Sequence, residues 1–199
     1  MRIKGLLFLL GGVILSCSTN SSRKESTAKN FDLATINTAK GKIIILLYNE
    51  TPRHKASFIK LVKAHYFDSL TFNRVIENFV IQGGCPDTPA GFSDSPYLLE
   101  PEFNQKLRHI YGAVGAGRDN NPDMLSAGCQ FYIVQNKEGL HRLDDKYTVF
   151  GRVVKGMDVV DKIAKVATDS LDAPIEPIGL IVGIEKIDSA ELYEKYLSK

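Results

Sequence analysis

The chain has 199 residues, and its 25 Lys and Arg against 23 Asp and Glu give a formal net charge of +2. Two of the basic residues, Arg2 and Lys4, precede an uncharged apolar run over residues 6–15, a pattern typical of an export signal that ends at Ser16. Without these two residues the basic and acidic residues balance at 23 each, so the composition gives no support to nucleic-acid binding. The rest of the chain is long enough for one domain with an ample core.

Residues 14–17, Ile-Leu-Ser-Cys, resemble a bacterial lipobox, in which the Cys is lipidated and becomes the first residue of the mature chain. A lipid on Cys17 would anchor the protein to a membrane without spanning it. The resemblance implies a cell-envelope lipoprotein that faces the periplasm, and Ser18 in place of an Asp favours the outer membrane. The alternative, a buried N-terminal helix, is disfavoured because residues 18–30 are strongly polar and predict a flexible tether.

Apolar runs bounded by turn residues predict eight β-strands in the remaining chain. They cover residues 31–38, 42–48, 70–76, 79–82, 111–116, 131–135, 147–154 and 178–187. Residues 83–110 contain four Pro and three Gly and are expected to form an ordered loop.

Two helices are expected between these strands. Thr51 as N-cap and Pro52 at the first helical position predict a helix to about residue 64, with Ala56, Ile59 and Val62 on one face. Residues 158–166 show a second helical pattern. Short connections between most strands favour a mainly β fold, a closed barrel with helices over its ends. The chain is thus divided into a signal (1–16), a lipidated Cys and tether (17–30), a folded domain (31–189) and a polar helical tail (190–199).

Three sequence blocks carry a resemblance to a known family. Residues 72–84 read FNRVIENFVIQGG, residues 128–133 read GCQFYI, and residues 143–153 read LDDKYTVFGRV. In this order and spacing they resemble the signature segments of the cyclophilin-type peptidyl-prolyl cis–trans isomerases, and the likeness extends over residues 31–189. It implies a closed eight-stranded antiparallel barrel capped by two α-helices, and an enzyme that turns X–Pro bonds and so assists the folding of exported proteins.

The reaction explains which residue types the site needs. An X–Pro bond rotates over a barrier of about 18–20 kcal/mol because resonance stiffens its C–N bond. Rotation breaks this resonance, so the reaction requires no nucleophile, metal or redox cofactor, and we expect none. A donor that meets the prolyl nitrogen as its lone pair localises would lower the barrier. The resemblance assigns this role to Arg74, with Gln82 orienting the substrate and the arginine.

The resemblance also implies eight substrate-binding residues. Five match the wall of the proline pocket or the aromatic residue that closes it, namely Phe79, Val80, Tyr132, Leu143 and Tyr147. The other three fall where the family binds the peptide backbone around the proline, namely Gln130, Gly117 and Arg118. Taken alone, the apolar residues of this set would be interpreted as core, and a single Arg on a strand as a surface group.

Some positions depart from the family pattern. Cys85 and Cys129 stand where cyclophilins usually have an acid and a serine, each beside a pocket glutamine. In an oxidising compartment this pair suggests a disulfide, and two free thiols are the alternative. Arg142 replaces the Trp of cyclosporin-sensitive members, which argues for weak cyclosporin binding.

Two classes of function remain open at this point. The first is an isomerase, and the second is a non-catalytic module that binds proline-containing peptides or acts as a chaperone on the same barrel. Arg74 and Gln82 favour the enzyme, since a pure binder need not keep the donor. The expected partners are unfolded or extended proline-containing polypeptides and, through the lipid, a membrane, and we expect a monomer. The four His show no metal-ligand spacing, and no nucleophile motif of a hydrolase is present.

Overall fold

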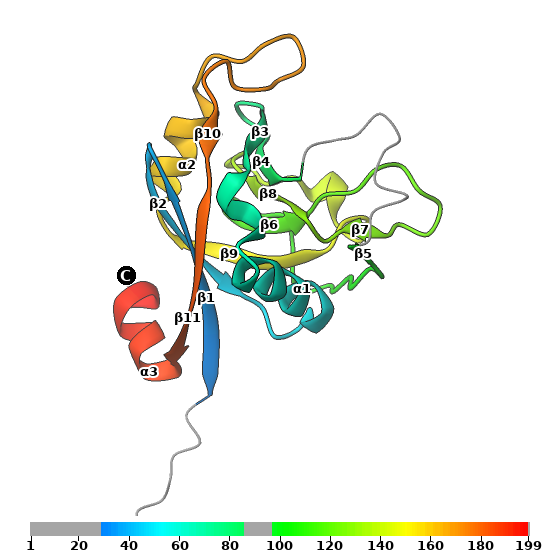
Figure 1. Cartoon of the computed structure of the whole chain (residues 1–199). Coiled ribbons are helices and arrows are strands. Elements are labelled where there is room, and N and C mark those ends of the chain that lie inside the picture. The colour runs from blue at the N-terminus through cyan, green and yellow to red at the C-terminus, as the bar shows by residue number, and fades with distance from the viewer. Residues whose placement is uncertain (1–28, 86–96, 199) are drawn as a thin grey trace, which may run out of the picture.

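The computed structural model describes residues 29–85 and 97–198 (Figure 1). The expected signal, the lipidated Cys17 and the tether as far as residue 28 lie outside the described residues, as does part of the expected loop over residues 83–110. Within the described ranges, no helix is long and apolar enough to cross a membrane.

Nine strands form one antiparallel sheet. These are β1 (Asn30–Thr38), β2 (Gly41–Leu47), β3 (Thr71–Val75), β4 (Val80–Gly84), β6 (Ala113–Ala116), β8 (Gln130–Val134), β9 (Val149–Lys155), β10 (Ile178–Gly179) and β11 (Ile181–Asp188). Their order across the sheet is β10-β3-β4-β8-β6-β9-β2-β1-β11. A separate pair joins β5 (Leu98–Leu99) to β7 (Ser126–Ala127), which the sequence did not predict.

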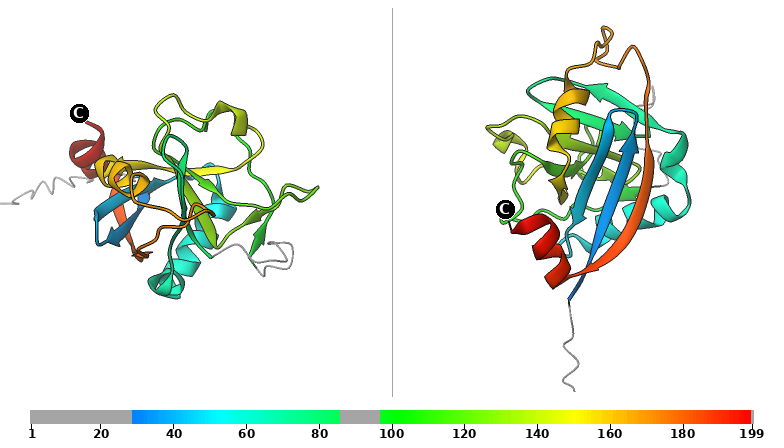
Figure 2. Two further views of the ribbon diagram at one scale, coloured as in Figure 1. Left: turned by 90° about the horizontal axis from the view of Figure 1, so that it is seen from above. Right: turned by 90° about the vertical axis from the view of Figure 1, so that its left-hand side faces the viewer.

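The helices are α1 (Pro52–Lys63), α2 (Met157–Ala164) and the short α3 (Ser189–Leu192), which continues into a π-helical turn (Tyr193–Leu197). Two 3-10 turns cover Tyr66–Ser69 and His141–Leu143. Helices α1 and α2 lie at opposite ends of the curled sheet (Figures 1 and 2).

The mainly β, antiparallel fold is confirmed, but the closed eight-stranded barrel is not reproduced strand for strand. The sheet curls into a half-barrel, and it has nine strands because the strand expected over residues 178–187 divides at Leu180. Ile178 pairs with Phe72 of β3 and Ile181 with Asn37 of β1, so the two outer strands of the sheet follow each other directly in the chain. Register shifts in the β2–β9, β3–β4 and β6–β9 pairs are the irregularities that let such a sheet bend.

Helix α1 begins at Pro52 as predicted, but a distant side chain caps it. Thr51 occupies the N-cap position, yet its side chain makes no capping hydrogen bond. The carboxylate of Glu102 instead accepts hydrogen bonds from the backbone N–H groups of Arg53 (3.0 Å) and His54 (2.9 Å). A carboxylate at this end also suits the positive end of the helix dipole.

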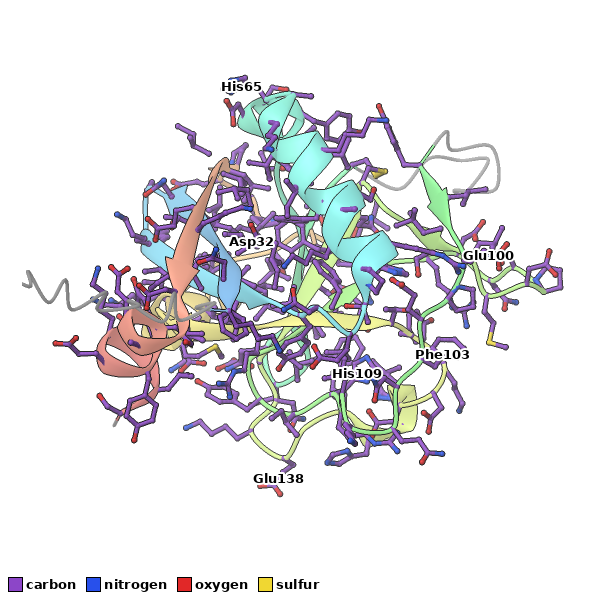
Figure 3. The ribbon with its side chains drawn as sticks, turned by 90° about the horizontal axis from the view of Figure 1, so that it is seen from below. Asp32, His65, Glu100, Phe103, His109 and Glu138 are labelled. Atoms are coloured by element: carbon purple, nitrogen blue, oxygen red, sulfur yellow. A yellow bond between two sulfur atoms is a disulfide. The ribbon has the colours of Figure 1, made fainter. Side chains whose placement is uncertain are left out.

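The buried face of α1 includes Val62 and, partly buried, Ile59 as expected, but it is centred differently. Phe58 lies in the core, with its ring centroid 5.8 Å from that of Phe131 in β8, whereas Ala56 is exposed. An ion pair of 2.6 Å between Lys55 and Asp32 joins the helix to β1, and Figure 3 labels Asp32. The helix thereby closes one end of the core under the strands that carry the pocket.

The C-terminal tail packs onto the sheet. Asp188 caps α3 by accepting hydrogen bonds from two backbone N–H groups. Leu192 of α3 is 3% exposed because it packs against an apolar patch on β1 and β2 that includes Leu33 and Ile44. The tail therefore covers a surface of the sheet that would otherwise be apolar and exposed.

Candidate active site

The ten residues that the resemblance implies as catalytic or substrate-binding lie around one pocket. Its volume is about 180 Å³ and its lining residues are Arg74, Phe79, Val80, Gln82, Gly117, Arg118, Gln130, Tyr132, Leu143 and Tyr147. They come from two kinds of structure. We call the part contributed by β3, β4, β8 and the turn before β4 the sheet wall, and the part contributed by residues 117–118 and 143–147 the loop wall.

The sheet wall is built from strand register. Arg74 of β3 pairs with Gln82 of β4, Gln82 pairs with Tyr132 of β8, and Tyr132 pairs with Gly115 of β6. Residues that are directly opposite on neighbouring strands project from the same face of a sheet. The ladder therefore places a guanidinium, an amide and an aromatic ring in one row, with Gly115 at the end of the row.

Gly115 is required by the ring beside it. A Cβ atom at this position would collide with Cζ and the hydroxyl oxygen of Tyr132. Since protein interiors are closely packed, the absence of this one carbon atom leaves the space that the Tyr132 ring fills.

Arg74 is held loosely at the open side of this row. Its Nε lies 3.6 Å from Oδ2 of Asp172, in the loop between α2 and β10, and its guanidinium lies 6.0 Å from the ring centre of Phe79. The backbone carbonyl of Asp172 also accepts a hydrogen bond from the N–H of Val75 (2.8 Å), which fixes the loop to β3. No residue in the described ranges accepts a hydrogen bond from the Arg74 guanidinium, so this donor is free for a ligand.

Phe79 is positioned by the turn that connects β3 to β4. Asn78 in this turn has φ 59°, a left-handed conformation that Asn tolerates better than most residues. Its N–H donates to Oε1 of Gln135 (2.7 Å), and its carbonyl accepts from Nδ2 of Asn136 (2.7 Å). Two side chains that follow β8 thereby fix the turn and the ring of Phe79.

A buried polar chain connects the two walls. Nε2 of His109 lies 2.8 Å from the hydroxyl of Tyr132, and its Nδ1 lies 2.8 Å from Oδ1 of Asp144. The backbone N–H of His109 donates to the same carboxylate oxygen, and Nδ1 of His141 lies 2.9 Å from the other one. His109 is fully buried and lies across β9 from helix α1 (Figure 3). Asp144 directly follows Leu143, so these hydrogen bonds connect the loop wall to Tyr132 of the sheet wall.

The pKa values of Asp144, His109 and Tyr132 define the protonation of this hydrogen-bonded group. Burial favours a higher pKa for Asp144, but hydrogen bonds from the backbone and ring of His109 and from His141 outweigh it and lower the pKa to about 2. Burial lowers the pKa of His109 against the opposing effect of Asp144, and burial raises the pKa of Tyr132 well above its usual value. At neutral pH the neutral His109 therefore donates from Nδ1 to the carboxylate, and the Tyr132 hydroxyl donates to Nε2.

The loop wall depends on side-chain contacts with the backbone and with rings. The Arg118 guanidinium lies 4.5 Å from the ring centre of Tyr147, and it donates to the carbonyls of Lys146 (3.3 Å) and Asp119 (3.0 Å). A Cβ atom on Gly117 would collide with the side chain of Gln130, so the chain passes closely over that amide here. These contacts bring together two loops that no strand pairing connects.

A disulfide joins the ends of two neighbouring strands of the sheet wall, β4 and β8. Cys85 follows β4 and Cys129 precedes β8, and the two are bonded with their Cα atoms 5.4 Å apart. Nε2 of Gln130 donates to the carbonyl of Cys85 (3.0 Å), and the N–H of Cys85 donates to the carbonyl of Cys129 (2.9 Å). The disulfide that the sequence suggested thus lies beside a residue of the pocket.

Sequence reasoning missed two residues that act on the site. Asp172 faces Arg74 from a loop almost 100 residues away, and the resemblance blocks do not include this loop. His109 lies in a segment that was interpreted as loop, and its role follows from the hydroxyl of Tyr132. That hydroxyl was the available signal, since a buried Tyr generally requires a hydrogen-bonding partner. Within residues 29–85 and 97–198, no group of three or more His, Cys, Asp or Glu side chains could hold a metal ion.

Comparisons with known proteins identify peptidyl-prolyl cis-trans isomerases as relatives. Residues 33–185 match the protein family described as cyclophilin type peptidyl-prolyl cis-trans isomerase/CLD. A peptidyl-prolyl cis-trans isomerase of Acinetobacter baylyi is 34% identical over 198 residues, which cover 95% of this chain and 100% of that protein. The isomerase ppi1 of Schizosaccharomyces pombe is 36% identical over 152 residues, 75% of this chain and 96% of the relative.

A solved structure shares the fold. The crystal structure of a Cryptosporidium parvum cyclophilin-type isomerase in the presence of the dipeptide Ala-Pro has a TM-score of 0.68 at 23% identity. The alignment covers 77% of this chain and 98% of that one.

Proposed function

Because this chain belongs to the cyclophilin-type peptidyl-prolyl cis–trans isomerases, and is an enzyme of that class, we propose that it turns X–Pro bonds with Arg74 as the donor to the prolyl nitrogen. The observation that carries this assignment is the row of Arg74, Gln82 and Tyr132 across three neighbouring strands that line one pocket. The C. parvum relative was crystallised in the presence of Ala-Pro, which supports a proline-containing peptide as the ligand of this pocket as well.

The proposed mechanism uses charge that develops only during rotation. In the planar ground state the prolyl nitrogen shares its lone pair with the carbonyl group and accepts hydrogen bonds poorly. When the bond twists, the lone pair localises on nitrogen, and a donor placed there stabilises the transition state more than the ground state. Arg74 suits this role because its guanidinium is charged at every physiological pH and no described residue already accepts a hydrogen bond from it.

The remaining residues hold the substrate. Val80, Tyr132 and Leu143 give the proline ring an apolar surface, while Gln82 and Gln130 offer amide groups to the peptide backbone. Both glutamines are buried, so their amides are held in place before the peptide binds. A peptide fixed at both flanks of its proline can rotate about the X–Pro bond without leaving the pocket.

The test is catalysed isomerisation of an Ala-Pro peptide by the full chain in mild detergent, compared with Arg74→Ala and Arg74→Lys. We expect Arg74→Ala to lose about 100-fold in kcat/KM, as other electrostatic donors do when removed. Its free energy of unfolding should change by less than about 1 kcal/mol, because the pair with Asp172 is long and half-exposed. An inactive parent that still binds proline peptides would replace the enzyme with the non-catalytic binding or chaperone module.

We further propose that the enzyme works at a membrane surface of the cell envelope, on exported proteins. Residues 1–16 have the pattern of an export signal, and Cys17 stands where a lipobox has its lipidated Cys. Cys17→Ser should release the protein from the membrane fraction and abolish incorporation of labelled fatty acid. A parent chain that carries no lipid would contradict this part of the proposal without affecting the isomerase assignment.

A further inference from the structure

The pocket is unusually cationic for a site that binds uncharged proline. Two of its ten lining residues, Arg74 and Arg118, are arginines, and none is acidic. A third arginine, Arg142, lies at the rim with its guanidinium 4.8 Å from the ring centre of Phe79, which itself lines the pocket. The chain as a whole carries a net charge of only +2, so this local excess is a property of the pocket.

Carboxylates of the chain neutralise little of this charge. Within the described residues, neither Arg118 nor Arg142 forms an ion pair with a carboxylate, and the pair of Arg74 with Asp172 is 3.6 Å long. The guanidinium of Arg118 bonds to main-chain carbonyls, which do not cancel its charge.

The acidic side chains of the adjacent loop have other partners. Asp144 accepts hydrogen bonds from His109 and His141, and Asp145 pairs with Arg108 at 2.8 Å. The carboxylates of the loop that follows Leu143 therefore pair with His109, His141 and Arg108, and not with Arg118 or Arg142.

Ring stacking prepares these arginines for binding. Arg118 lies over the ring of Tyr147 and Arg142 over the ring of Phe79, and these contacts restrict both guanidiniums. Nε and Nη1 of Arg118 already donate to main-chain carbonyls, which leaves its Nη2 for a ligand, whereas no described residue accepts a hydrogen bond from Arg142. A guanidinium edge matches a carboxylate with two parallel hydrogen bonds. Binding to a group that is already oriented costs less conformational entropy than ordering a free side chain.

We propose that this isomerase prefers substrates with an acidic side chain next to the proline, and that Arg118 and Arg142 are its specificity-determining residues. This inference rests on the proposed function and names the substrate class of the same pocket. The side chain that flanks the proline lies beside the ring of Phe79 or Tyr147, where one of the two guanidiniums meets it. Arg74 remains committed to the prolyl nitrogen.

The test compares peptides that differ only in charge. Glu, Gln and Lys are placed in turn directly before or directly after the proline, and kcat/KM and peptide affinity are measured with the full chain in detergent at low and high salt. We expect kcat/KM for the Glu peptide to exceed that for the Lys peptide by about two- to fivefold at low salt, the range of partly exposed ion pairs. The ratio should fall towards one at about 1 M salt, where the screening length is near 3 Å.

Variants assign the preference to these residues. Arg142→Gln and Arg118→Gln should each reduce the Glu-to-Lys ratio, and the double variant should bring it near one. Arg53→Gln removes the same charge from helix α1, outside the pocket, and should keep the full ratio. A parent ratio near one, or an equal reduction in Arg53→Gln, would overturn the inference.

Failure of the proposed function gives a different result. If the parent accelerates none of the peptides, the isomerase assignment of Arg74 fails, but the affinities still test the preference, because Arg118 and Arg142 would bind a carboxylate without turnover. If the parent accelerates all peptides equally, the isomerase assignment stands and only the acidic preference is wrong.

Discussion

The two walls of the pocket are held by different kinds of interaction. The sheet wall is fixed by backbone ladders, with Arg74, Gln82 and Tyr132 opposite one another on β3, β4 and β8. The loop wall contains no strand. Single backbone hydrogen bonds to Gln130 and Ala127 hold Gly117, and side-chain contacts of Arg118 with Lys146 and of Asp144 with His109 hold the rest.

The two walls are therefore expected to differ in rigidity. A strand register is supported by many neighbouring hydrogen bonds, so the donor and the floor of the pocket are insensitive to the loss of a single contact. The loop wall depends on a few polar contacts, of which the Asp144–His109 pair is the most buried, so the same loss has a larger effect there. The proposed preference for acidic substrates therefore depends on the wall with fewer supporting contacts.

The largest effect is expected at the disulfide, which reinforces the sheet wall. Replacing both Cys85 and Cys129 by Ser removes a bond between positions 44 residues apart, and loop-closure entropy predicts a loss of about 4 kcal/mol in the free energy of unfolding. Since the β4–β8 ladder remains, the folded fraction should keep most of its kcat/KM.

Chemical denaturation and the Ala-Pro assay measure the two effects. Dithiothreitol should lower the stability of the parent by the same amount and leave the double variant unchanged. A folded double variant without activity would show that the bond, and not the ladder, positions Gln130.

The next largest loss of stability is expected from Gly115→Ala, which adds a side-chain atom within the packing of the sheet wall. The new Cβ would collide with the Tyr132 ring, and such overpacking typically costs about 1–3 kcal/mol in stability. Because the ring must then move into the pocket or distort β8, we expect kcat/KM to fall strongly as well. Gly183→Ala in β11 is the matched control, since its Cβ would meet no atom within 4 Å and should cost little. Equal effects of the two substitutions would refute the packing role of Gly115.

A smaller effect is expected when only the connection between the walls is removed. Tyr132→Phe deletes the hydroxyl and leaves Nε2 of His109 buried without a partner, at a cost of about 1–2 kcal/mol in stability. The ring itself stays in register, so kcat/KM should change little. Tyr147→Phe makes the same chemical change on the loop wall, where no described residue bonds the hydroxyl, and should be nearly neutral in stability. A strong loss of activity in Tyr132→Phe alone would show that the polar chain also positions the sheet wall.

The same division explains what could be predicted from the sequence. Strands such as β1, β2 and β8 were predicted because the hydrophobic period and the residue types of a strand are local properties. Strand β10 was not predicted as separate from β11, because the break at Leu180 depends on a change of partner strand. The resemblance named pocket residues on both walls, since its motifs span β3, β4, β8 and the segment before β9. Glu102 as the cap of α1, and His109 and Asp172 in the site, could not be predicted, because each acts on a residue 23 to 98 positions away through tertiary contact.

The smallest expected effect is a dependence of stability on pH. Burial lowers the pKa values of His109 and His54, so both are neutral in the folded protein at a pH where an unfolded His, with its usual value of about 6.5, takes up a proton. The unfolded state therefore binds more protons below pH 6.5. The contribution of these two histidines to the free energy of unfolding is complete above that pH. It is lost as the pH falls towards their lower pKa values in the folded protein. Urea unfolding at pH 7.5 and 5.5 should show this loss, while the carboxylate of Asp144 stays ionised throughout.

Protonation of His109 adds the proton at Nε2, which faces the Tyr132 hydroxyl of the sheet wall, while Nδ1 keeps its hydrogen bond to Asp144 of the loop wall. With both ring nitrogens donating, the Tyr132 hydroxyl must turn to accept, and its own proton loses the partner it has at neutral pH. Hydrogen exchange should consequently increase between pH 7.5 and 5.5 in the segment around the buried His109 more than in β4 and β8, whose backbones are held by strand pairing. His109→Gln should weaken the pH dependence of stability, whereas the exposed His65→Gln should preserve it. A parent whose stability is constant over this interval would show that Asp144 compensates His109 completely, and the loop wall would then be as insensitive to pH as the sheet wall.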